Sequence, residues 1–177
     1  MHIILGLIAA ATAFYFIVIR ARHGAEVASE LLDVADDIRA AARRFGFRRR
    51  TGQHPVDGID DPKLAIGGLA SAFLELDDLP TADARAATDL SLRKHLGIDA
   101  GTAEEIAILG RWFVESCHGA AAAFPRLAKR LRTIDGANSF QPLMSVLGDI
   151  VASGSSGAPS HRQSDALAEL SRIFRLQ

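Results

Sequence analysis

The spacing of apolar and polar positions predicts helices along the whole chain. From Asp61 onward apolar residues recur at intervals of three and four, the period of an amphipathic helix, and no stretch shows the alternation of a half-buried strand. The predicted helices start near Pro62, Thr81, Thr102, Pro125, Phe140 and Ser160. The pattern therefore predicts an all-α domain of about six helices over residues 62–177.

Capping residues mark several of these helix starts, and Thr81 is the predicted cap of the second helix. Asp61 can accept hydrogen bonds from the first free backbone N–H groups, and Pro62 takes the first helical position, where no donor is needed. The segments Thr102–Glu105 and Ser160–Gln163 have the spacing of a capping box. Pro125 can stand in the first turn of another helix for the same reason as Pro62.

Two stretches of the domain repeat one plan. Residues 64–98 and 140–176 each give a helix, a polar turn and a second helix. One constant offset aligns Leu69 with Leu147, Leu92 with Leu170, and Ile98 with Leu176. A repeated supersecondary unit buries its apolar face against the other copy, so we expect a pseudo-twofold pair of helix-loop-helix units.

The N-terminal part of the chain carries a strongly apolar segment. Ile3–Ile19 contains no charged residue and is close to the length of about 20 residues that spans a bilayer. A cleavable secretory signal is the alternative, but no basic region precedes the apolar run. Arg20 and Arg22 follow it, and the positive-inside rule then places the rest of the chain in the cytoplasm. We expect residues 1–22 to anchor the protein in a bacterial inner membrane, with the N-terminus outside.

Small residues within the predicted anchor suggest a contact between two copies of the chain. Gly6 and Ala10 have the small-xxx-small spacing found where transmembrane helices approach closely. A homodimer formed through the transmembrane helix is therefore one expectation.

A helical stalk is predicted over residues 23–50. Its apolar stripe consists of Val27, Leu31, Val34, Ile38, Ala41 and Phe45. The stripe could form a parallel coiled coil, but a seam of under three heptads favours packing against the chain's own domain. The Gly, Pro and Asp content of residues 51–61 predicts a linker between this stalk and the domain.

The stalk ends in the basic segment RRFGFRRR, Arg43–Arg50. Arginines interleaved with aromatic residues can hold phosphates and stack bases. A basic run beside a membrane segment is more typical of a topology determinant or a lipid-headgroup contact, and no nucleic-acid recognition motif accompanies it. With 20 basic and 21 acidic residues the whole chain has a net charge of −1, so we predict no nucleic-acid partner.

The sequence offers little for catalysis. Cys117 is the only cysteine, which excludes an internal disulfide. It lies on the apolar face of a predicted helix, and the adjacent His118 points about 100° away from it, so we expect an inert buried thiol. We find no nucleophile elbow and no phosphate-binding loop, and we predict a protein that is not an enzyme and has no cofactor.

Two groups of residues remain as candidate sites. Asp77 and Asp78 stand in the turn of the first repeated unit and could offer oxygen ligands to Mg²⁺ or Ca²⁺, although without an established ligand spacing. Weak divalent-metal binding, and with it a metal-responsive sensor, is therefore the alternative function.

The second group lies on the helix that carries Pro125. Leu127, Leu131 and Ile134 mark its buried side. The basic residues that we expect to face outward are Arg126, Lys129, Arg130 and Arg132. This basic surface predicts contact with a protein partner, whose identity the sequence does not give.

The domain resembles the TerB-like (tellurite-resistance) helical family over residues 62–176. The resemblance rests on the paired helix–polar loop–helix units and on GRWFVESC followed by the basic helix AFPRLAKRLRTI. It implies a compact helical bundle in a stress-response or protein-interaction module, with loop acids implicated in metal binding. Here the first unit has LDDLP and the second SGSSG, so only one loop keeps acids. The membrane anchor also resembles that of membrane-anchored DnaJ-like co-chaperones, but no J domain follows.

Overall fold

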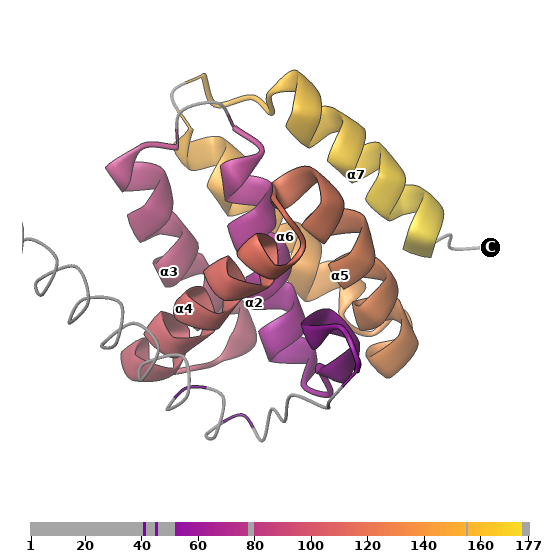
Figure 1. The fold of residues 1–177 in the computed structure, drawn as a ribbon. Helices are drawn as coiled ribbons and strands as arrows, with labels where there is room; N and C mark the ends of the chain where they lie inside the picture. Colours follow the sequence, from indigo (N-terminus) through magenta and orange to yellow (C-terminus); the bar gives the residue numbers. More distant parts are fainter. Residues whose placement is uncertain (1–40, 42–44, 46–51, 78–79, 155, 175–177) are drawn as a thin grey trace, which may run out of the picture. The chain divides into compact units, whose positions relative to one another are not determined.

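The computed structural model describes residues 41, 45, 52–77, 80–154 and 156–174 (Figure 1). The chain divides into two units, residues 1–37 and 38–177, and all described residues belong to the second. They form one short 3₁₀-helix and six α-helices, with no strand among them. The elements are η1 Pro55–Gly58, α2 Pro62–Glu75, α3 Ala82–Leu96, α4 Ala100–Ser116, α5 Ala120–Asp135, α6 Phe140–Ser153 and α7 His161–Phe174. The prediction of an all-α fold is confirmed.

The predicted membrane anchor is outside this description. Among the described residues, no helix has the length and apolar character needed to cross a membrane. Ile3–Ile19 lies outside them, as do all of residues 1–22 and most of the predicted stalk, so the anchor and the homodimer through it stay predictions.

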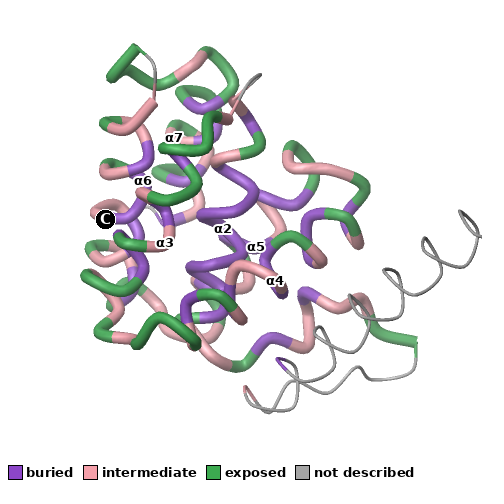
Figure 2. Tube along the Cα trace, turned by 90° about the vertical axis from the view of Figure 1, so that its left-hand side faces the viewer, coloured by how far each residue is buried: buried purple, intermediate pink, exposed green. Residues whose placement is uncertain are grey.

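Helix α2 is the centre of the core. Every residue from Leu64 to Phe73 is buried, and Figure 2 shows this helix as the most continuously buried element. It contacts α3, α4, α5 and α6. An apolar surface around the whole circumference requires neighbours on all sides, which explains why the other helices surround it.

Glycines allow α4 to approach α2 closely. A Cβ atom on Gly67 would overlap the Cγ2 atom of Ile106 on α4. A Cβ atom on Gly110 would overlap the Ser71 hydroxyl and lie 3.1 Å from the carbonyl oxygen of Gly67. The two backbones therefore meet at a distance that side chains would prevent.

Three predicted caps are confirmed. The Asp61 carboxylate accepts from the Lys63 N–H at 2.8 Å, and the Thr81 hydroxyl accepts from the Ala84 N–H at 3.1 Å. At the start of α7 the Gln163 N–H donates to the Ser160 hydroxyl at 3.2 Å, while the Gln163 side-chain oxygen accepts from the Ser160 N–H at 3.0 Å. This reciprocal pair is a capping box.

Gln163 also ties α7 to the core. Gln163 is only 4% exposed, and its side-chain amide donates to the carbonyl oxygen of Phe73 at 3.2 Å. The remaining buried residues of α7 are Ala166, Leu170 and Phe174, and the helix packs mainly on α5.

Two predicted helix starts are wrong. α4 begins at Ala100 because the Asp99 carboxylate, rather than Thr102, is the cap, and it accepts from the Thr102 N–H and hydroxyl, both at 2.9 Å. α5 begins at Ala120, so Pro125 stands inside the helix instead of in its first turn.

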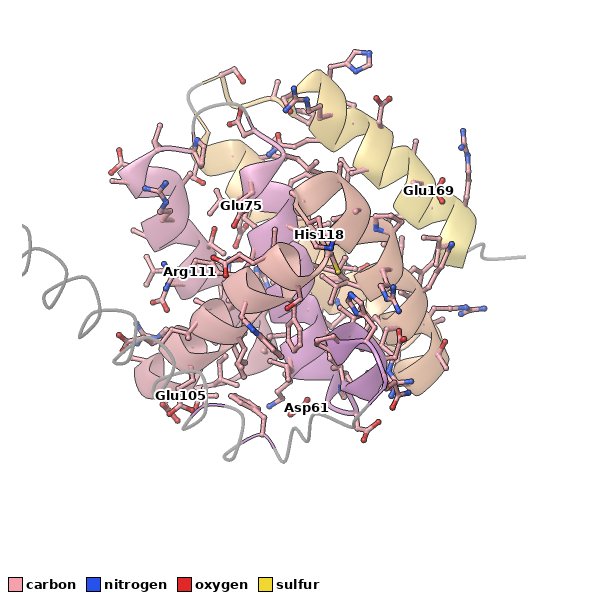
Figure 3. All side chains as sticks on the ribbon, viewed as in Figure 1. Asp61, Glu75, Glu105, Arg111, His118 and Glu169 are labelled. Atoms are coloured by element: carbon pink, nitrogen blue, oxygen red, sulfur yellow. The ribbon has the colours of Figure 1, made fainter. Side chains whose placement is uncertain are left out.

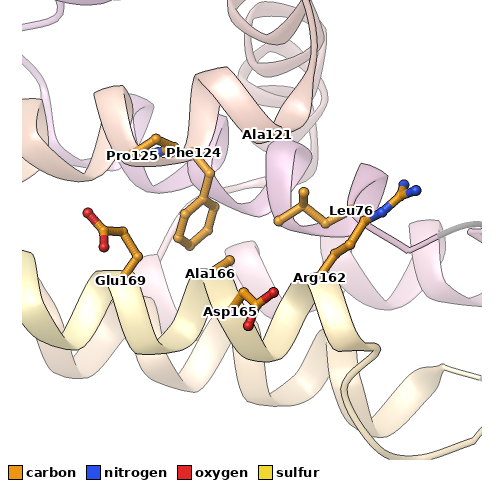
Figure 4. A pocket seen from close by; sticks show the side chains of 8 residues that line it. All are labelled: Leu76, Ala121, Phe124, Pro125, Arg162, Asp165, Ala166 and Glu169. Carbon is orange, nitrogen blue, oxygen red and sulfur yellow. The ribbon is translucent and has the colours of Figure 1, made fainter.

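The interior proline is tolerated because of its surroundings. Pro125 has no N–H to donate to the carbonyl oxygen of Ala121, four residues earlier, but Ala121 is exposed and water can supply the missing bond. Both residues border a groove of about 260 Å³ between α5 and α7, with Phe124, Leu76 and Ala166 also lining it (Figure 4).

The two repeated units bury equivalent leucines, but their helices pack against different neighbours. The aligned leucines Leu69, Leu147, Leu92 and Leu170 are all at most 1% exposed. A two-fold axis would place α7 against α2 as it places α3 against α6, yet α3 packs along α6 whereas α7 packs mainly on α5. The pattern of apolar positions is repeated, but the expected two-fold arrangement is not observed.

The segment predicted as a linker is part of the domain. In its described part, residues 52–61, Val56 and Ile59 are fully buried, and η1 contacts α4 and α5. The linker prediction is wrong because two separated apolar residues show no periodicity yet bury completely. Ala41 of the predicted stalk is 1% exposed in the same core and Phe45 packs against it, which supports packing on the chain's own domain at these two positions.

Candidate functional site

The predicted basic residues of α5 have different neighbours. The Arg126 guanidinium donates to both carboxylate oxygens of Asp57, at 3.2 and 2.6 Å. Arg130 donates to the carbonyl oxygen of Ile59 at 2.6 Å and to the Asp60 carboxylate at 2.7 Å. The expectation that these two arginines stand free on the surface is wrong, because both hold the segment around η1 against α5.

These bonds fix the arginines in place. The two-pronged contact with Arg126 lowers the pKa of Asp57 below its ordinary value, and the carboxylate in turn raises the pKa of Arg126. The Arg130 side chain is only 21% exposed. Its position is therefore set by packing as well as by hydrogen bonds.

Lys129 lies between them in sequence and behaves differently. It is exposed and forms no ion pair with a described residue. Together these three residues, which we call the α5 basic face, border a polar hollow of about 430 Å³. The hollow is lined by Gln53, Asp57, Arg126, Lys129, Arg130 and Thr133. The face thus consists of two arginines held by acids and one lysine whose charge is open to a partner.

Arg132 does not belong to this face. Its guanidinium carbon lies 5.9 Å from the centre of the Phe174 ring on α7, a cation–π contact. Arg132 therefore covers the end of α7, away from the hollow that Lys129 borders, and the expectation of four basic residues on one surface reduces to three.

The acidic turn after α2 gives no metal site in the described structure. Asp77 is partly buried directly after α2, and Asp78 lies outside the described residues. Among the residues that the structure covers, no group of three His, Cys, Asp or Glu side chains is placed to hold a metal ion. Metal binding at Asp77 and Asp78 stays a prediction.

The only thiol has a histidine partner that the sequence did not reveal. Cys117 is the C-cap of α4, and its sulfur lies 3.8 Å from the Nε2 atom of His54, which precedes it by 63 residues. The Val56 N–H donates to Nδ1 of His54 at 3.3 Å, so the neutral ring carries its proton on Nε2, which donates to the Ser116 carbonyl oxygen at 3.2 Å. The ring nitrogen nearest the sulfur is therefore a donor and cannot take the thiol proton.

Burial also keeps the Cys117 thiol protonated. Cys117 is 8% exposed, and desolvation raises the pKa of its thiol above the ordinary value. A nucleophilic cysteine needs the opposite change, a lowered pKa or an adjacent base. The geometry at Cys117 is that of a packed core residue, as the sequence predicted.

Figure 3 shows the side chains of the described residues on the ribbon. Away from Cys117, Ser91 and His95 of α3 both bond to the Asp149 carboxylate of α6 at 2.9 Å. The Ser91 hydroxyl donates to the carboxylate, and no bond between it and the His95 ring is found among the described residues. Comparisons of the chain with protein-family models, with curated proteins and with solved structures gave no match.

Proposed function

We propose that this protein is a non-catalytic interaction module that binds an acidic segment of a partner protein through the α5 basic face. In this proposal the anchor at Ile3–Ile19 holds the domain at the cytoplasmic face of a bacterial inner membrane. The TerB-like resemblance of residues 62–176 and a role in stress response belong to the same proposal.

The observation that carries the proposal is the way Arg126 and Arg130 are held. Long cationic side chains lose rotamer freedom when they bind, at roughly 0.5–1.5 kcal/mol for each immobilised side chain. Asp57, Asp60 and the Ile59 carbonyl have already ordered both arginines. An acidic segment that enters the hollow therefore meets two ordered guanidinium groups and the free ammonium group of Lys129.

Tethering would strengthen such a contact. A site that is weak in solution gains from the high local concentration when the domain and its partner are held at one membrane. The acidic residues of the predicted stalk, Glu26 to Asp37, could compete for the same face.

The absence of a catalytic role is proposed from the state of the Cys117 thiol. Its nearest imidazole nitrogen is a hydrogen-bond donor, and burial raises its pKa. Both features oppose nucleophilic chemistry at the only cysteine of the chain.

The test uses Lys129 alone, since reversing Arg126 or Arg130 would leave Asp57 or Asp60 without its partner and disturb η1. The full chain carrying Lys129→Glu is cross-linked in membranes and the captured proteins are compared with those of the unchanged chain. Lys63→Glu, an equal charge change at an exposed position on α2, is the matched control.

We expect Lys129→Glu to lower the yield of acidic partners, and we expect the captured complexes of the unchanged chain to weaken as salt is raised. The midpoint of thermal unfolding should stay unchanged, because exposed substitutions shift stability by roughly 0.5 kcal/mol or less. Equal capture by both variants and the unchanged chain would refute the proposal.

A further inference from the structure

A third cavity borders the C-terminal half of α2. It is a cleft of about 480 Å³ bounded by α2, α3, α4 and Pro80, which lies shortly before α3. Its apolar wall consists of Leu74, Pro80, Leu92 and Ala107. The volume falls within the range of roughly 300–1,000 Å³ that is usual for small-molecule sites.

Charged groups of both signs open on this cleft from three helices. Glu75 comes from α2, Arg85 from α3 and Arg111 from α4, and Figure 3 labels Glu75 and Arg111. Neither guanidinium group forms an ion pair or a hydrogen bond with another described residue. Their donors are therefore available to a ligand.

The Glu75 carboxylate likewise forms no ion pair or hydrogen bond with a described residue. Burial, and then the negative charge of Glu115, raise the pKa of Glu75, while the positive charges of Arg111 and Arg85 lower it. The fourth charged residue of the cleft, Asp89, is already paired with Arg93 at 3.9 Å along α3. The cleft thus presents one carboxylate and two guanidinium groups that no direct bond satisfies within the described structure.

We propose that this cleft binds a small zwitterion with an apolar side chain, of the amino-acid class. Its ammonium group pairs with Glu75, its carboxylate accepts from Arg85 and Arg111, and its side chain lies on the apolar wall. This site is independent of the α5 basic face.

Simpler ligands satisfy the cleft less well. A plain organic anion would engage the arginines but would approach the Glu75 carboxylate without offering it a donor. A plain amine would engage Glu75 and leave both guanidinium groups unmatched. Only a ligand with both charges meets every open group. Glu75, Arg85 and Arg111 are all exposed, so a ligand that lacks one charge leaves the unmatched group to water and loses that ion pair.

The test compares three probes that share one apolar body. L-leucine carries both charges, 4-methylpentanoate lacks the amine, and 3-methylbutylamine lacks the carboxylate. Each is titrated calorimetrically into the purified full chain in phosphatidylcholine nanodiscs, with empty nanodiscs subtracted. We expect L-leucine to bind about tenfold or more tightly than either analogue, because each analogue loses a charge-assisted hydrogen bond.

Substitutions assign each charge to its residue. Arg111→Gln should weaken L-leucine and 4-methylpentanoate but leave 3-methylbutylamine unchanged, and Glu75→Gln should weaken L-leucine and 3-methylbutylamine but not 4-methylpentanoate. Arg172→Gln removes an exposed positive charge from α7 and should leave all three probes unaffected. Arg85→Gln serves as a second variant if Arg111→Gln unfolds.

Several results would overturn the proposal. They are the absence of L-leucine binding at millimolar concentration, equal binding of all three probes, or an unchanged L-leucine affinity in Glu75→Gln and in both arginine variants.

Discussion

Replacing Gly110 with alanine should destabilise the domain by forcing α2 and α4 apart. The new Cβ atom would overlap the Ser71 hydroxyl, and it would lie 3.1 Å both from the Ser71 Cβ atom and from the carbonyl oxygen of Gly67. The hydroxyl can rotate away, but the backbone oxygen and the Ser71 Cβ atom can move only with α2. The whole helix, which is the centre of the core, must therefore shift.

The size of the effect follows from two opposing contributions. Overpacking at a tight contact costs about 1–3 kcal/mol, and exchanging glycine for alanine inside a helix contributes about 1 kcal/mol in the other direction. We expect a net loss of up to about 2 kcal/mol in the free energy of unfolding. For a domain of this size that corresponds to a fall of up to roughly 8 °C in Tm.

Gly148 provides a matched control within the same fold. It is exposed in the middle of α6, and a Cβ atom built on it meets nothing within 4 Å. Gly148→Ala should therefore raise the free energy of unfolding by about 0.5–1 kcal/mol, the gain in helix propensity alone. Thermal and urea unfolding followed by circular dichroism measure both variants.

The same glycine-to-alanine exchange should thus lower the free energy of unfolding at Gly110 and raise it at Gly148. Ser71→Ala combined with Gly110→Ala should recover part of the loss, because it removes the overlapping hydroxyl and leaves the backbone contact. A Gly110→Ala variant as stable as Gly148→Ala would refute the close crossing of α2 and α4.

Two further predictions concern the α3–α6 contact and the membrane. Hydrogen bonds from His95 and Ser91, both at 2.9 Å, lower the pKa of Asp149 below its ordinary value of 3.8. A lowered folded-state pKa gives stability that is present above the unfolded value and is lost as the pH falls through the folded one. Asp149→Asn should therefore lower the free energy of unfolding at pH 7, by less than about 1 kcal/mol for this 40% exposed side chain, and urea unfolding should show the difference vanishing in acid. Full-length protein should stay in the membrane fraction after a carbonate wash, and a periplasmic reporter fused to its C-terminus should stay inactive. An active reporter would contradict the orientation that Arg20 and Arg22 predict.

Features encoded by neighbouring residues could be predicted from the sequence. The caps at Asp61, Thr81 and Ser160 depend on side chains that bond to N–H groups within three residues. The apolar stripes likewise identified the buried faces, including the leucines that the two repeated units share. Local chemistry is enough for both.

Features set by tertiary packing could not be predicted. Val56 and Ile59 stand among Gly, Pro and Asp residues that indicate a loop, and only contact with α4 and α5 buries them. Pro125 is interior to its helix because exposure at Ala121 lets water replace a backbone donor. The spacing of apolar residues shows neither which helices cover the loop around Val56 and Ile59 nor whether water reaches the Ala121 carbonyl.

In the candidate sites, too, the residue types could be predicted from the sequence, whereas their tertiary neighbours could not. The sequence identified the basic residues of α5 but not the acids that hold them, because Asp57 precedes Arg126 by 69 residues. Cys117 was assigned correctly to the core, while its contact with His54 required the fold. The cleft of Glu75, Arg85 and Arg111 draws one charged residue from each of three helices, and no motif joins them.

The double use of Gln163 has a consequence for how the domain folds. A 14-residue helix such as α7 is too short to persist alone in water. The side chain that completes its N-terminal cap also bonds to the Phe73 carbonyl, so the cap is finished in the place where the helix docks. Helix formation and docking should then be a single kinetic event. A peptide of residues 158–177 should be a random coil, and the amide protons of α7 should exchange with one common opening free energy instead of fraying turn by turn.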